Sequence, residues 1–338
     1  MRSTGTEAAA ISGRSYRGSL LWVFAWLVGL GLIAGLIGVH DFDQVVAALS
    51  LAGWSMTLIG IVCIGVLLAD TLGWRALLQP SERPSLGAML VRRWIGGSIN
   101  GLLPVAQVGG DIVRAHLLSR AGVAGPLAGA SVVVDVTVGL ATQFAFVLLG
   151  LVLLLAAQDG SPWLLRLGAG LGTLALAVLG FVLLQQRGLF LPLARLVERA
   201  TRGRGWLDLT GSAASLDREV LARYRDRVRL SICAGWRLLG WLCGSAEIWL
   251  IFWLLGYPIG IAEAVALESL GQAVRSLGFV LPGGLGAQES AIMAGGMMVG
   301  IAPDLALAVA LIKRARDLAY GLSGLIAWSV LDVGGRRG

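Results

Sequence analysis

The hydrophobic positions of this chain fall in long runs that are separated by short polar stretches. Runs of about 20 apolar residues predict helices that cross a membrane. Such runs occupy residues 19–39, 52–69, 127–157, 164–184, 232–255 and 306–330. Residues 259–281 form another candidate, although they include Glu263, Glu268 and Arg275. The pattern predicts an all-α, polytopic membrane bundle with about seven or eight crossings.

Two breaks interrupt the apolar pattern where the chain should lie within the bilayer. They share a proline, glycines and an acid, namely Pro104, Gly109, Gly110 and Asp111 in the first and Pro282, Gly283, Gly284, Gly286 and Glu289 in the second. Proline removes a backbone donor and glycine loosens a helix, so such a break is costly in lipid unless it lines a protected cavity. We expect a re-entrant segment at each break.

The two breaks also agree in spacing. In each, the acid follows the proline by seven residues, and a charged residue, Asp135 or Lys313, follows the acid by twenty-four. Interrupted segments at corresponding places in two halves of a membrane protein predict a central binding site. We therefore divide the single membrane domain, 1–338, into a first half, 1–185, a linker, 186–230, and a second half, 231–338. Chance alignment in a Gly-rich apolar chain is the alternative.

The linker is rich in arginine and has an amphipathic pattern. Leu216, Val220 and Tyr224 recur at helical spacing, and Glu219 stands four residues before Arg223. This pattern predicts helices that lie on the membrane surface, with arginines directed toward anionic lipid head groups. A solvated linker that merely obeys the topology rule explains the arginines equally well.

The distribution of arginine predicts the topology. Arginines precede the first span, and others gather in residues 75–93 and in the linker. By the positive-inside rule, the N-terminus, the 75–93 loop and the linker are cytoplasmic. The net charge of +7 therefore reflects membrane topology, and we expect no nucleic acid as a partner.

Composition supports a membrane protein and argues against several kinds of chemistry. Hydrophobic residues make up 57% of the chain and charged residues 14%, with a mean hydropathy of +0.80, which is too apolar for an ordinary soluble domain. The three cysteines and two histidines form no metal-ligand motif. Nucleotide-binding and hydrolase motifs are missing as well. We expect no metal, no cofactor and no catalytic residue.

The charged residues inside apolar segments are the candidates for a binding site. Arg275 could hold a phosphate or carboxylate near the second break, where Glu289 follows and backbone N–H groups are exposed. Asp111 and Arg114 occupy the first break. Buried ion pairs are the alternative use of such charges, and their candidate partners are Asp135, Glu268, Lys313, Arg314 and Asp317. Pairing of Glu289 with Lys313, or of Asp111 with Arg314, would need no substrate.

The motifs resemble those of a known family. The run Pro282-Gly283-Gly284-Leu285-Gly286 with Glu289, the first break with Arg114, and Trp74-Arg75 after the second span are similar to the lysylphosphatidylglycerol synthase transmembrane-region, or flippase-like, family. The first break departs from the family by carrying Asp111 where glutamate is usual. The stretches 273–279 and 313–318 are further similar to the subgroup associated with hopanoid biosynthesis.

The resemblance implies a multi-pass protein of the bacterial inner membrane that moves a lipid, either a hopanoid or an anionic phospholipid. Enzymes of this family carry an additional soluble aminoacyl-transferase domain, which the chain lacks, so we expect no enzymatic activity. A polyprenyl-lipid-dependent transferase with Asp111 or Glu289 as the base is one alternative. A non-transporting scaffold that binds lipid-biosynthesis enzymes is another. In every case membrane lipids are the expected partners.

Overall fold

The computed structural model describes residues 56–103, 108–157, 180, 209–277 and 287–335, and these residues contain helices and no strand. The α-helices are α3 (Met56–Ala76), α4 (Leu86–Leu102), α5 (Gly109–Ser119), α6 (Gly125–Ala157), α9 (Leu209–Arg225), α10 (Arg227–Leu254), α11 (Ile261–Leu277), α12 (Ala287–Met298) and α13 (Pro303–Gly335). A 3-10 turn, η2, spans Pro80–Glu82. The predicted all-α membrane bundle is confirmed.

Three of the described helices are long and apolar enough to cross a membrane: α3, α6 and α10. Their apolar stretches correspond to the predicted spans 52–69, 127–157 and 232–255. The predicted spans 19–39 and 164–184 lie outside the described residues. The predicted count of about seven or eight crossings therefore stays a prediction.

Two further predicted spans correspond to described helices. The described part of the span 259–281 is α11, of 17 residues, and residues 278–281 lie outside the described residues, so a crossing here stays a prediction. The helix within 306–330 is α13, whose 33 residues extend about 50 Å. It continues without interruption through Lys313, Arg314, Arg316 and Asp317, whose side chains are paired inside the bundle.

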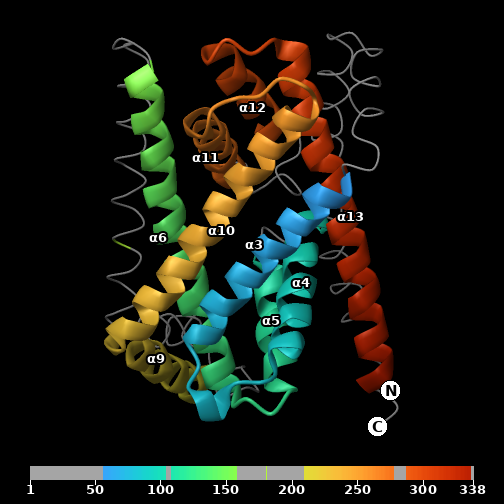
Figure 1. Cartoon of the computed structure of the whole chain (residues 1–338). Coiled ribbons are helices and arrows are strands. Elements are labelled where there is room, and N and C mark those ends of the chain that lie inside the picture. Colours follow the sequence, from blue (N-terminus) through green and yellow to red (C-terminus); the bar gives the residue numbers. More distant parts are fainter. Residues whose placement is uncertain (1–55, 104–107, 158–179, 181–208, 278–286, 336–338) are drawn as a thin grey trace, which may run out of the picture.

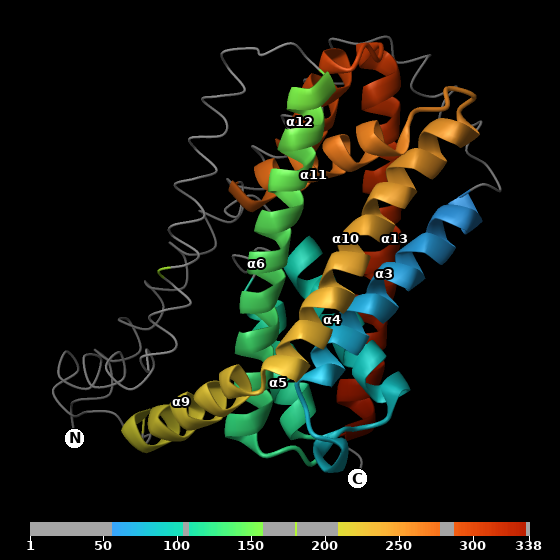
Figure 2. The same ribbon diagram turned by 60° about the vertical axis from the view of Figure 1, so that its left-hand side comes forward.

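The helices are arranged around a crossing pair. Helices α3 and α10 pack along each other through the middle of the molecule, while the long helices α6 and α13 lie on either side (Figure 1). The short helices α4 and α5 gather at one end, and α11 and α12 gather at the other (Figures 1 and 2). Helix α4 packs on α13, and α11 packs on α6. Each short pair is therefore joined to the long helix that follows the other pair.

Close glycine contacts allow these helices to approach. A Cβ atom on Gly110 of α5 would lie 2.0 Å from the carbonyl oxygen of Gly96 on α4. On α6, a Cβ on Gly150 would clash with the hydroxyl of Ser269 on α11, and on α13, one on Gly324 would lie 2.0 Å from the Ser98 hydroxyl. Small residues let membrane helices pack backbone to backbone, and here they bring the polar side chains of neighbouring helices into contact.

Helix α9 is the described part of the linker, and it forms as the amphipathic pattern predicts. Its apolar side chains do not lie on a lipid surface, however. Leu216, Val220 and Tyr224 pack against a buried cluster that includes Val134 of α6 and Cys233 of α10. Arg223 lies 3.6 Å from Glu219 on the same helix and 3.2 Å from Glu82, which ties α9 to the loop after α3. Burial against α6 satisfies the apolar face without lipid.

Candidate functional site

A cavity of about 350 Å³ lies at the centre of the bundle, and eight helices contribute to it. We call it the central cavity. Its charged lining residues are Asp70, Arg93, Asp111, Arg114, Glu247, Glu268, Arg275, Lys313, Arg314, Arg316 and Asp317. Charges at membrane depth are expensive and usually face a cavity or pair with one another; here they do both. A volume of this size is in the range of small-ligand pockets.

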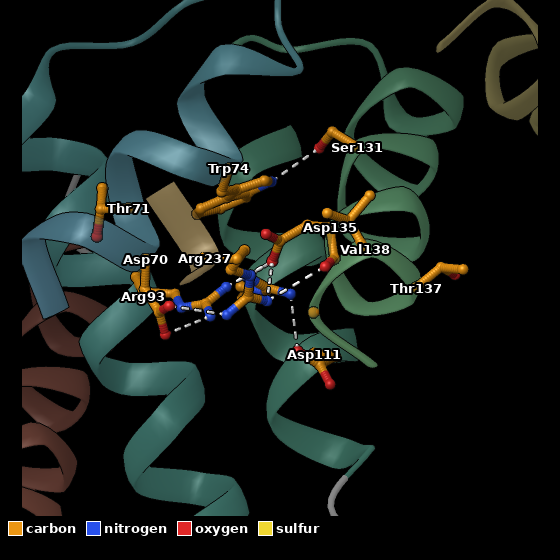
Figure 3. Close-up of polar contacts among 12 residues, drawn as sticks. Asp70, Thr71, Trp74, Arg93, Asp111, Ser131, Asp135, Thr137, Val138 and Arg237 are labelled. Atoms are coloured by element: carbon orange, nitrogen blue, oxygen red, sulfur yellow. Dashed lines mark hydrogen bonds and ion pairs between the residues drawn. The ribbon is translucent and has the colours of Figure 1, made fainter. Parts of the chain in front are cut away.

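Asp135 on α6 organises the charges at the α4 and α5 side of the cavity. Its Oδ2 atom lies 2.5 Å from Arg93, 2.6 Å from Arg114 and 3.1 Å from Arg237. The side chain is completely buried. Three guanidinium groups from three different helices, α4, α5 and α10, therefore converge on one carboxylate oxygen (Figure 3).

Two further aspartates complete this group, which we call the Asp135 cluster: Asp70, Arg93, Asp111, Arg114, Asp135 and Arg237. Asp70 on α3 binds Arg93 at 2.8 Å and Arg237 at 2.9 Å. Asp111 lies 2.9 Å from Arg114, one helical turn away on α5. Three arginines face three aspartates, so the cluster is electrically neutral. A neutral, mutually bonded set is the form in which buried charges are tolerated.

Trp74 of α3 packs against the cluster. Its ring lies 4.8 Å from the guanidinium carbon of Arg114, a cation–π contact. The indole N–H donates to the Ser131 hydroxyl at 3.1 Å, and both residues are fully buried. Figure 3 shows the ring between α3 and α6, directly beside the arginines. The tryptophan fixes the Arg114 side chain and also joins α3 to α6.

A second group of charges, the Glu268 cluster, comprises Glu247, Glu268, Lys313, Arg316 and Asp317. Lys313 Nζ lies 2.5 Å from Glu268 Oε2 and 4.0 Å from Glu247 Oε2. Arg316 holds Glu247 through two nitrogens, at 2.8 and 2.5 Å, and Asp317 through the third, at 2.6 Å. Gln272 donates to the free oxygen of Glu268 at 2.8 Å. Helices α10, α11 and α13 are thereby bonded around the cavity.

Glu289 and Asp111 each have a different ion-pair partner from the one suggested by the sequence. Glu289 on α12 binds Arg314, whose Nε and Nη2 atoms both lie 2.7 Å from Oε1. Lys313 is the next residue on α13, but consecutive helical positions point about 100° apart, and it faces α11 instead. Among the described residues no ion pair joins Asp111 to Arg314, and Asp111 pairs instead with Arg114 on its own helix.

Arg275 has a different environment from the other cavity cations. It is half-buried near the end of α11 and lines the cavity. Every other basic residue of the lining lies within ion-pair distance of an acid. Within the described part of the chain, Arg275 has no acid at that distance, although it is close enough to Asp317 for electrostatic interaction. Its guanidinium is thus available on the described side of the cavity.

The glycines of the first break act in packing. Gly110 sits so close to α4 that no side chain fits, and its N–H donates to Asn100 Oδ1 at 2.7 Å. Gly109 begins α5. The N–H of Gly110 is therefore already satisfied and is not free for an anion. The other break residues, namely Pro104, Pro282, Gly283, Gly284 and Gly286, lie outside the described residues.

Two arginines of the Asp135 cluster were not predicted. Arg93 was assigned to a cytoplasmic loop, but it lies inside α4, where Met89, Ile95 and Ile99 form the buried face. The apolar residues that continue along the chain to Leu102 are the sequence signal that could have placed Arg93 in a helix. Arg237 falls inside the predicted span 232–255, where a charge marks an interior-facing position.

Among the described residues, no group of three metal-ligating side chains comes together.

The chain was compared with models of known protein families. The model of the lysylphosphatidylglycerol synthase TM region matches residues 26–324, which is most of the chain. The chain belongs to this family. Comparisons with curated proteins and with solved structures found no match.

Membership in the lysylphosphatidylglycerol synthase TM-region family identifies a membrane protein tied to lipid metabolism. The family describes the transmembrane region of these synthases, which is their non-catalytic part. Nothing in the match concerns the hopanoid-associated subgroup, which stays a prediction. The match covers both breaks and both charge clusters, so the central cavity belongs to the region that the family shares.

Proposed function

We propose that this protein binds the polar head group of an anionic phospholipid in the central cavity and moves the lipid between the two leaflets of a bacterial inner membrane. The observation that carries the proposal is Arg275, a cavity-lining guanidinium without an ion-pair partner among the described residues. Guanidinium groups bind phosphate through two parallel hydrogen bonds. A phosphodiester would supply the negative charge that pairs with Arg275, as carboxylates do for the other basic residues of the cavity.

The size and lining of the cavity support a head group and not a whole lipid. About 350 Å³ accommodates a small polar ligand, whereas acyl chains would stay in the surrounding bilayer. The lining carries eleven charged residues, which suits a charged head group better than a largely apolar hopanoid. Among the described residues, no feature favours a hopanoid, the other predicted cargo.

The arrangement of the short helices supports movement around a fixed site. The α4–α5 pair and the α11–α12 pair enter from opposite ends, and each packs on the long helix that follows the other (Figure 1). On α6, which follows the first pair, Asp135 binds Arg93 of α4. On α13, which follows the second pair, Lys313 binds Glu268 of α11. This correspondence favours two related halves. Broken helices that meet at a central site are how many transporters alternate access between the two sides.

The distribution of basic residues supports a cytoplasmic location for the end that contains α9. The loop after α3 and the start of α10 lie at this end, with Arg83, Arg223, Arg225, Arg227 and Arg229. At the opposite end, the loops near Gly256 and Gly300 have acids close by, Glu263 and Asp304, and no arginine in residues 255–262 or 299–304. The positive-inside rule therefore favours a cytoplasmic location for the α9 end, and the cytoplasmic N-terminus stays a prediction from the sequence.

The test is mass spectrometry of the lipids that co-purify with the full-length protein. Wild type, Arg275→Ala and Arg218→Ala would be isolated from the native membrane and normalised to bulk lipid. Arg218 is an exposed residue of α9 and serves as the matched control. We expect anionic phospholipid to be enriched with wild type and Arg218→Ala and lost with Arg275→Ala. Bulk-like lipid in all three would refute the proposal and favour the scaffold; enrichment of a polyprenyl lipid would favour the transferase.

A further inference from the structure

A second pocket, of about 540 Å³, opens at the seam between the end of α3 and the start of α10. We call it the seam pocket. Its lining includes Arg75, Arg83, Asp226, Val228, Arg229 and Ile232. None of these residues lines the central cavity. The end of α3 and the start of α10, which line the pocket, lie at the end of the molecule that contains α9 (Figure 1).

Three arginines face a single acid in the seam pocket. Arg229 Nε lies 2.7 Å from Asp226, and its Nη1 donates to the Leu78 carbonyl at 2.5 Å. Arg83 Nε donates to the same carbonyl at 2.9 Å. The side chain of Arg75 has no partner among the described residues, and its Nε atom is buried. The pocket therefore has two more positive than negative charges, in contrast to the balanced Asp135 cluster.

The arrangement of these arginines is unfavourable without an anion. Burial lowers the pKa of Arg83, and the like charges of Arg75 and Arg229 lower it further. Two of the three guanidinium groups are held by backbone carbonyls after α3 and so cannot move apart without losing hydrogen bonds. Pre-oriented guanidinium groups that repel one another are the usual surroundings of a bound phosphate.

The other wall of the pocket is apolar and exposed. Val228 is 71% exposed and Ile232 is 47% exposed, and both belong to α10, a candidate membrane span. Both residues lie in the first two turns of α10, so we expect this exposed surface to meet lipid near the membrane interface. The pocket thus places basic groups beside a lipid-facing surface at one end of a span, where anionic head groups of the cytoplasmic leaflet accumulate near arginine.

We propose that the seam pocket binds a phosphate group, presented by the head group of an anionic phospholipid whose acyl chains run along Val228 and Ile232. Arg75 and Arg83 hold the phosphate oxygens, and Arg229, neutralised in part by Asp226, positions them. A soluble phosphate ester shares the same chemistry but makes no use of the apolar wall. This site is separate from the central cavity, and its existence does not depend on transport.

The test measures ligand-induced thermal stabilisation of the purified full-length protein in detergent. The probes are dihexanoyl phosphatidylglycerol, dihexanoyl phosphatidylcholine and inorganic phosphate at equal concentrations. The proteins are wild type, Arg75→Gln, Arg75→Gln/Arg83→Gln and Arg218→Gln. Arg218 is an exposed arginine whose Nε contacts only its own helix, at 3.4 Å from the Ala214 carbonyl, so it controls for a general loss of positive charge.

We expect phosphatidylglycerol to stabilise wild type and Arg218→Gln more than either other probe does. Its apparent affinity should fall about tenfold in the double variant, since two charge-assisted hydrogen bonds are lost. Arg75→Gln removes no described hydrogen bond, so it keeps the test valid if the double variant does not fold, and its affinity should fall severalfold. Equal effects of the two lipids, or unchanged affinity in Arg75→Gln, would overturn the site. Equal stabilisation by inorganic phosphate would overturn its assignment to a lipid.

Discussion

Lys313 on α13 donates a hydrogen bond to Glu268 on α11 across 2.5 Å, in the interior of the bundle. The matching position of the first half, counted from its break, is Asp135, which binds Arg93 on α4. The two sites therefore have opposite polarity: the long helix supplies the cation in one and the anion in the other. Both join a long helix to a short one beside the central cavity.

The first prediction concerns this ion pair. Lys313→Met should lower the free energy of unfolding by about 3–5 kcal/mol, because it leaves the buried Glu268 carboxylate without its partner. The double variant Glu268→Gln/Lys313→Met should recover most of that loss, since it leaves no buried charge unpaired. Unfolding in mixed detergent measures both. Glu219→Gln, at a 40% exposed acid of α9, is the control and should cost less than about 1 kcal/mol. A double variant as unstable as the single one would contradict this explanation.

The second prediction ranks two aspartates of the Asp135 cluster. Asp135→Asn removes the negative charge that three arginines share and should cost at least about 3–5 kcal/mol, because it leaves buried guanidinium groups uncompensated. Asp70→Asn should cost less, because the Asp70 side chain is 24% exposed and water can compensate for the lost charge. The ranking is measured by the thermal unfolding temperature of the two variants in the same detergent. Equal loss would indicate that Asp135 is not the centre of the cluster.

The third prediction tests the contact between α4 and α5. Gly110→Ala should destabilise the protein by at least about 3 kcal/mol, because the new methyl group would overlap the Gly96 carbonyl oxygen. Gly65→Ala is the matched control, since a Cβ there meets nothing within 4 Å. Alanine is the better helix former, so this change should be neutral or stabilise by up to about 1 kcal/mol. If Gly110→Ala unfolds like Gly65→Ala, the close approach of the two helices is wrong.

The fourth prediction distinguishes the observed position of α9 from a helix that floats on lipid. Val220 is fully buried against α6 and α10, so Val220→Ala should cost about 2 kcal/mol. Val228, which is 71% exposed, gives the matched substitution and should change stability by less than about 0.5 kcal/mol. Limited proteolysis in residues 209–225 provides a second readout, which should become faster only in Val220→Ala. Identical behaviour of the two variants would favour a surface-lying helix.

Much of the fold could be predicted because hydrophobic length determines where a chain can cross lipid. The runs that contain α3, α6 and α10 are predominantly apolar, with only Asp135 charged in the second and Arg237 and Glu247 in the third, and the structure has helices there. Whether α11 and α13 cross the membrane was harder to predict, because charged residues such as Glu268, Arg275 and Lys313 give the same sequence signal in a span, a short helix or a loop. The outcome depends on the residues that pack against them, and these come from distant parts of the chain.

The site was predictable in its residue types and not in its pairings. Asp111, Asp135, Glu268, Glu289, Lys313, Arg314 and Asp317 were identified because charges in apolar runs need a partner or a cavity. Which acid meets which base depends on helix rotation, and a change of one residue turns a side chain by about 100°. That is why Glu289 was assigned to Lys313 when it binds Arg314. Arg93 was missed because it follows a basic loop, and only its helical register shows that it points inward.

The central claim is that a lipid head group enters the cavity at Arg275, and leaflet-to-leaflet movement tests it most directly. The full-length protein would be reconstituted in vesicles with a trace of phosphatidylglycerol that carries a fluorescent acyl chain, and the fraction accessible to an external reductant followed over time. Wild type and Arg218→Gln should raise the rate above protein-free vesicles, and Arg275→Gln should lose most of that increase while keeping its thermal stability. Equal rates in wild type and Arg275→Gln, or no increase in any protein, would contradict the account.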